Sequence, residues 1–233
     1  MDAWRHLPAW QLERRADLFF GVFLATVLEA TFDVAINPRI VPELPLLKRL
    51  VQARARPGLS SVKLDYFAMA ADGSRGFLVE LKTDVRSRRA GQDAYLHAAQ
   101  RVGLPALMQG VVDIVVGPRL RDVHRDHKYA WMVHALSELG CLTAPDAYRR
   151  AVYAEDRTGL TAAARSLAVT APDCPLEVVY VQPVRSDEEA SGTTTIDFEA
   201  FAAVIEATKE PMGARFAQSL RDWTCPPAAE PPG

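Results

Sequence analysis

The stretch VKLDYFAMAADGSRGFLVELKTD, residues 62–84, places three charged side chains inside two otherwise apolar runs. Asp65 lies in the first run, and Glu80 and Lys82 lie in the second. Burying a charge is costly unless the charge is paired or binds a metal. These three side chains therefore either neutralise one another or hold a divalent ion and a reacting phosphate.

The two runs predict a β-hairpin, with strands over residues 62–69 and 76–83 and an Asp-Gly turn between them. Side chains alternate between the two faces of a strand, so Glu80 and Lys82 are expected to share a face. Asp65 is expected to reach that face from the neighbouring strand. The pattern predicts one cluster of two carboxylates and one ammonium.

This set of side chains is typical of metal-dependent phosphodiester hydrolysis. Two carboxylates can hold Mg²⁺ or Mn²⁺, hard ions that prefer oxygen ligands, and the backbone carbonyl of Leu81 is a further candidate ligand. A bound metal activates water, and a lysine can orient that water or stabilise the transition state. Only five of the 27 basic residues are lysines, which is a weak further sign that Lys82 is needed as a compact charge.

The rest of the chain predicts a mixed sheet flanked by helices. Helices are expected at 10–32, 90–102, 126–140, 146–153 and 197–208, the last with Asp197 as its N-cap. Strands are expected at 39–47, on an edge because of its prolines, and at 176–184, with loops at 49–61 and 186–194. Residues 105–117 fit a helix, a strand or both.

We expect an α/β domain over residues 1–223, followed by a disordered proline-rich tail at 224–233. A net charge of −2 gives no global basic signal, so nucleic acid would have to bind a local patch. Three distant cysteines argue against a disulfide framework or a zinc knuckle. The longest N-terminal apolar run is too short to span a bilayer, so we expect a cytoplasmic protein without a membrane partner.

The order of helix, Asp-bearing strand, hairpin, Glu-x-Lys strand and helix resembles the PD-(D/E)XK nuclease superfamily. The segments PELPL, LDYF and LVELKTD resemble those of a bacterial group of uncharacterised members within this superfamily. The resemblance implies an α-β-β-β-α-β core, covering about 10–102 plus 176–208, with a mainly helical elaboration at about 105–175. Leu64 stands where the motif that names the superfamily has proline.

The resemblance also implies roles for individual residues. Asp65 and Glu80 would bind Mg²⁺, and Lys82 would act in catalysis. Members often carry another acid from the first helix or first strand, for which Glu43 is the first choice and Glu29 the second. Glu13 and Asp17 on the predicted first helix are further alternatives.

RecB-like members carry a Gln and a Tyr on the helix that follows the catalytic strand. Gln92 and Tyr95 occupy that place here, at a spacing one residue shorter than usual. Arginines around the proposed site suit phosphate contacts, namely Arg86, Arg88 and Arg89 with Arg75. The alternatives are a surface glutamine, a core tyrosine and a solvated basic loop.

Residues 119–134 contain His124, His127 and His134 among several arginines, which repel a cation. A solvated helix or a basic face explains this stretch better than a metal site does.

Two functions remain open. The first is a Mg²⁺-dependent nuclease acting on DNA rather than RNA, in phage defence or DNA repair by analogy with its fold. The second is a non-catalytic nucleic-acid-binding or scaffold protein in which the three charges form a structural network. A homodimer or a protein partner is compatible with both.

Overall fold

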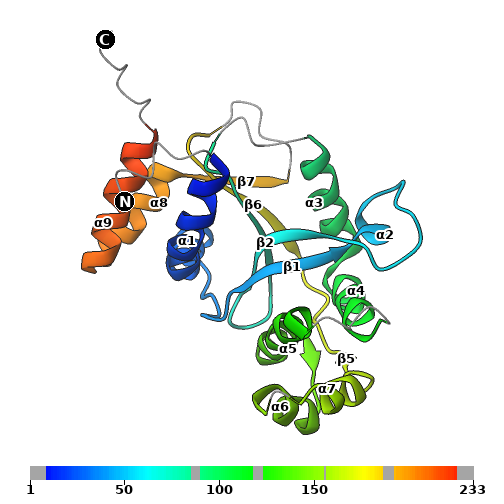
Figure 1. Cartoon of the computed structure of the whole chain (residues 1–233). Helices are drawn as coiled ribbons and strands as arrows, with labels where there is room; N and C mark the ends of the chain where they lie inside the picture. Colours follow the sequence, from blue (N-terminus) through cyan, green and yellow to red (C-terminus); the bar gives the residue numbers. More distant parts are fainter. Residues whose placement is uncertain (1–8, 85–89, 118–122, 155, 186–191, 225–233) are drawn as a thin grey trace, which may run out of the picture. The chain divides into compact units, whose positions relative to one another are not determined.

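The computed structural model describes residues 9–84, 90–117, 123–154, 156–185 and 192–224. The helices in this part of the chain are α1 (Ala9–Phe32), α2 (Lys48–Val51), α3 (Ala90–Val102), α4 (Leu104–Val116), α5 (Val123–Glu138), α6 (Asp146–Tyr153), α7 (Arg157–Ala164), α8 (Phe198–Ala207) and α9 (Pro211–Thr224). The strands are β1 (Val41–Leu47), β2 (Ser61–Met69), β3 (Gly76–Leu81), β4 (Leu142–Thr143), β5 (Ala168–Val169), β6 (Leu176–Gln182) and β7 (Thr193–Asp197). Figure 1 shows these elements along the chain.

The fold is α/β, with a mixed five-stranded sheet in the order β1-β2-β3-β6-β7. The first three strands run antiparallel, with Leu44 opposite Leu64 and Tyr66 opposite Val79. β6 runs parallel to β3. The Gly76 amide donates to the Pro175 carbonyl and the Lys82 amide donates to the Val181 carbonyl, so residue numbers rise in the same direction along both strands. A second sheet contains β4 and β5 alone.

The chain divides into two compact units, and the boundary passes through β3 and β6. The first unit contains residues 1–36, 80–89 and 179–233. The second unit contains residues 37–79 and 90–178. Glu80 and Lys82 therefore belong to the first unit, and Asp65 belongs to the second.

Aromatic side chains fill the core of the first unit. Phe20 of α1 packs edge-on against Phe201 of α8 and Phe216 of α9, with ring centroids 5.1 Å away in each case. All three rings are buried. The spacing of apolar residues along α1 gives it one broad apolar stripe, and burying that stripe holds α1 against α8.

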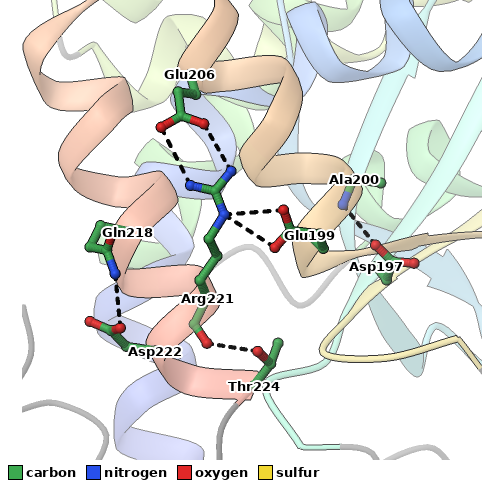
Figure 2. Close-up of polar contacts among 8 residues, drawn as sticks. All are labelled: Asp197, Glu199, Ala200, Glu206, Gln218, Arg221, Asp222 and Thr224. Atoms are coloured by element: carbon green, nitrogen blue, oxygen red, sulfur yellow. Dashed lines mark hydrogen bonds and ion pairs between the residues drawn. The ribbon is translucent and has the colours of Figure 1, made fainter.

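Charged groups outside this core join α8 to α9 (Figure 2). Arg221 of α9 donates to Glu199 and Glu206 of α8, with nitrogen–oxygen distances of 3.1 and 2.9 Å. The Arg221 guanidinium holds the pKa of Glu206 below its usual value. Asp197 accepts a hydrogen bond from the Ala200 amide at 2.7 Å, which confirms its predicted role as the N-cap of α8.

The second unit builds its core on β1, β2, α4 and α5. Buried Cys141 lies between α5 and β4, and its thiol donates to the Met69 sulfur of β2 at 3.1 Å. Burial is the main cause that raises the pKa of the Cys141 thiol to about 12. This cysteine is therefore a core residue rather than a nucleophile.

The predicted strands at 62–69 and 176–184 and the helices at 10–32, 90–102 and 146–153 match described elements within a few residues. The predicted helix at 126–140 begins earlier, at Val123, and ends at Glu138. Residues 104–116 form the single helix α4, so of the alternatives left open for 105–117 the helix is correct. Its apolar residues cover the face that packs on β1.

Several expectations were wrong or incomplete. Residues 48–51 form the short helix α2 at the start of the segment predicted as a loop. The loop predicted at 186–194 overlaps β7, which begins at Thr193. The β-branched run of threonines suits a strand paired with β6. The proline-rich tail from residue 225 lies outside the described residues, so the prediction of disorder stays a prediction.

Among the described residues, no helix is both long and apolar enough to cross a membrane.

Candidate functional site

Glu80 and Lys82 form a buried ion pair at the end of β3. Their exposed fractions are 3% and 6%, and Lys82 Nζ lies 3.0 Å from Glu80 Oε1. The two-residue repeat of the strand puts both side chains on one face, as the sequence predicts. Both residues are almost entirely buried, so this pair is in a far less polar setting than a surface ion pair.

The Lys82 ammonium has more donors than the described protein satisfies. It carries three N–H groups, and among the described residues only Glu80 accepts a hydrogen bond from it. An almost buried ammonium with unused donors requires other acceptors, such as water or an anion.

The neighbouring strand brings further polar groups to the same face. The Lys82 amide donates to the Val181 carbonyl at 2.8 Å. In a parallel pair a residue donates to the carbonyl that precedes its lateral neighbour, so Gln182 lies beside Lys82. Tyr180, two residues earlier, lies beside Glu80 by the same register. Gln182 is 3% exposed and Tyr180 is fully buried.

The other predicted acids lie in the second unit. Asp65 is half-buried on β2, and Glu43 is exposed on β1. Pairs on either side of them, Pro42 with Tyr66 and Leu44 with Leu64, place Glu43 and Asp65 at facing positions of the antiparallel ladder. The structure therefore aligns these two acids across neighbouring strands.

Glu43 has two unusual features for a residue within a strand. Its backbone is left-handed, with φ of 51°, and its carboxylate accepts a hydrogen bond from Lys63 Nζ at 3.0 Å. A non-glycine residue in this region costs free energy, and such residues are frequent at functional sites. This conformation favours a functional role for Glu43 over the role of a plain turn residue.

Glu29, the second choice for that acid, has a structural role. Its Oε1 accepts a hydrogen bond from the Ile36 amide at 2.9 Å, just beyond the end of α1. Asp17 lies on α1 and is partly exposed, and the side chain of Glu13 lies outside the described part.

The predicted substrate-binding residues divide into two sets. Gln92 is half-buried and Tyr95 is 9% exposed, and both lie in the first half of α3 in the second unit. Arg86, Arg88 and Arg89 lie outside the described residues. Arg75 lies just before β3, with its Nε 3.9 Å from a Glu177 carboxylate oxygen of β6.

The proposed metal ligands are all oxygen donors, which suits Mg²⁺. They are the carboxylates of Asp65, Glu80 and Glu43 and the carbonyl of Leu81, a buried residue between Glu80 and Lys82. No group of three or more His, Cys, Asp or Glu side chains arranged to hold a metal occurs within the described residues. The three proposed carboxylates are therefore not gathered into such a group among the described residues, and Mg²⁺, which commonly uses one or two carboxylates and keeps several waters, would have to be held by fewer of them.

His134 takes part in an aromatic cluster of the second unit. Its Nε2 lies 3.1 Å from the Tyr153 hydroxyl, and its ring meets Trp131 edge-on at 5.7 Å. The side chains of His124 and His127 lie outside the described part. The contacts of His134 are those of a packed aromatic ring.

The sequence-based prediction missed Gln182 and Tyr180. Both lie in LEVVYVQPV, which reads as a buried strand. One signal was present: Gln182 is a polar residue at the end of an apolar run, as Lys82 is in the preceding strand. Recognising it requires the β3–β6 register, which local sequence does not contain.

Comparisons of the chain with protein-family models, with curated protein sequences and with solved structures found no match.

Proposed function

We propose that this chain is a Mg²⁺-dependent nuclease of PD-(D/E)XK type that hydrolyses phosphodiester bonds, in DNA rather than RNA. The observation that carries the proposal is the buried Glu80–Lys82 pair, whose ammonium has one acceptor among the described residues. An ion pair with a purely structural role would stabilise the fold more if every N–H group of the ammonium had an acceptor within the protein. An ammonium with unused donors is suited to a phosphate oxygen or a reacting water.

The resemblance to PD-(D/E)XK nucleases assigns Asp65 to the site as a metal ligand. On neighbouring β1, Glu43 faces Asp65. In the proposed nuclease, Asp65 and Glu80 hold the metal, together with Glu43 and the Leu81 carbonyl.

The protein's own groups then have distinct tasks. A bound Mg²⁺ supplies Lewis acidity and lowers the pKa of its waters. Lys82 donates to the reacting phosphate or its water and stabilises the negative charge that develops. Gln92, Tyr95 and the arginines of 86–89 would bind the strand of nucleic acid.

The proposal is tested by incubating the wild-type chain with labelled single-stranded and double-stranded DNA and RNA in Mg²⁺, Mn²⁺ and EDTA. We expect cleavage that requires the metal and favours DNA. The Asp65→Ala variant should lose both cleavage and Mn²⁺ binding measured by calorimetry. Cleavage that persists in EDTA would contradict the proposal.

The ion pair also favours a second candidate, a non-catalytic binding or scaffold protein. Lys82 neutralises Glu80 within the chain, so the charges can be explained without a metal. In that case Asp65→Ala should change stability without any dependence on Mg²⁺ or Mn²⁺, and the wild type should cleave none of the four substrates.

A further inference from the structure

Buried polar side chains are concentrated on neighbouring strands of the first unit. Within the described part of the chain, the buried polar and charged residues are Glu80, Lys82, Gln182, Thr195 and Ser219. Ser219 is explained by its helix, since its hydroxyl donates to the Arg215 carbonyl at 3.2 Å. The others lie on β6, on β7 and at the end of β3, which are neighbours in the sheet.

Gln182 has an acceptor on this face that no residue in the described part of the chain uses. Its Nε2 donates to the Val184 carbonyl at 2.8 Å, which fixes the amide. Among the described residues, none donates to its Oε1. The Gln182 residue as a whole is 3% exposed, so an amide oxygen to which no described group donates is free to accept a hydrogen bond from a water or a ligand at this face.

Gln182 Oε1 and the Lys82 ammonium are complementary. One is an acceptor and the other a donor, and the register places their residues side by side on the same face. Adjacent strands lie about 4.8 Å apart. A water that makes two hydrogen bonds of about 2.8 Å spans such a separation and finds the polar partners it needs.

We propose that Lys82 and Gln182 hold one water between them, and that this water is the nucleophile of the reaction. The inference rests on the proposed nuclease function. Lys82 donates to the water oxygen, and the water donates to Gln182 Oε1. These two hydrogen bonds leave one lone pair of the water oxygen pointing away from both side chains. The water oxygen forms the new bond to phosphorus, the bond to the leaving oxygen breaks, and that oxygen takes up a proton as the water releases one to solvent.

The first test uses thermal unfolding, which does not depend on activity. Lys82→Met, Gln182→Met and the double variant are compared with wild type. A shared water is lost in either single variant, so the double variant should lower Tm by less than the sum of the two single shifts. Gln100→Met is the matched control, because Gln100 Nε2 donates to the Leu176 carbonyl of β6 in the other unit; its shift should add to that of Lys82→Met.

If Lys82→Met does not fold, the same cycle is made in the Glu80→Gln background, which leaves no unpaired carboxylate. Additive shifts in either background would overturn the inference, whatever the activity of the protein.

The second test separates positioning of water from binding of substrate. We expect Gln182→Met to lower kcat about 100-fold while leaving DNA affinity in Ca²⁺ unchanged. Gln182→Glu, which keeps an acceptor oxygen, should retain more activity than Gln182→Met, and Gln100→Met should cleave as wild type does. Wild-type kcat in Gln182→Met would overturn the role in catalysis. Non-additive Tm shifts without cleavage by wild type would overturn the nuclease and leave the shared water standing.

Discussion

Replacing Lys82 by methionine should destabilise the protein far more than replacing Lys63, although both lysines make the same kind of contact. Lys82 Nζ lies 3.0 Å from Glu80, and Lys63 Nζ lies 3.0 Å from Glu43. The exposed fractions of the side chains differ sharply: 7% and 4% in the first pair, 60% and 48% in the second. Burial is therefore the main variable that separates the two substitutions.

The expected magnitudes follow from this difference. Removing one partner of a buried pair leaves the other charge unpaired, which costs about 3–5 kcal/mol. An exposed pair contributes about 0–1 kcal/mol. We expect Lys82→Met to cost about 3 kcal/mol, the lower end of this range. The double variant Glu80→Gln/Lys82→Met should recover much of the loss, because no charge then remains buried.

Urea unfolding measures this directly. With a slope of about 2–3 kcal/mol per molar, Lys82→Met should lower the midpoint by about 1–1.5 M, and Lys63→Met by a few tenths. Equal shifts for the two variants would refute the reasoning. So would a double variant that is less stable than Lys82→Met.

Three further outcomes follow from the structure. Because burial raises the pKa of Cys141 to about 12, we expect it to resist alkylation at pH 8 until urea unfolds the chain, as read by mass spectrometry. A Cβ at Gly213 would lie 2.9 Å from a backbone carbonyl of α8, so Gly213→Ala should cost about 1–3 kcal/mol, whereas Gly91→Ala, with open space, should raise Tm. Arg221 lowers the pKa of Glu206, so the ion pair between them stabilises the fold fully above the unfolded pKa of 4.5. This stabilisation is lost as the pH falls through the lower pKa of the folded state. Arg221→Gln should return the pKa of Glu206, followed by NMR, towards 4.5.

Local sequence predicted the elements whose pattern is self-contained. Alternating apolar residues around Asp65 and Glu80 defined the hairpin, and the apolar stripe of residues 10–32 defined α1. The shared face of Glu80 and Lys82 followed from the period of a strand. These features depend on neighbours in the chain, which the sequence states directly.

Features that depend on distant contacts were not predictable in this way. Residues 111–116 are as suitable for a strand as for a helix, and packing against β1 decides for the helix. Gln182 becomes part of the candidate site through the parallel pairing of β6 with β3. The left-handed backbone of Glu43 is likewise a property of the folded ladder, since nothing in PELPL demands it.

The most direct test of the central claim is cleavage of labelled DNA in Mg²⁺ by wild type, Lys82→Ala and Lys63→Ala, each shown to be folded by circular dichroism. The account predicts cleavage by wild type and Lys63→Ala, and loss of at least about 100-fold in Lys82→Ala. Cleavage at the wild-type rate by folded Lys82→Ala would contradict it.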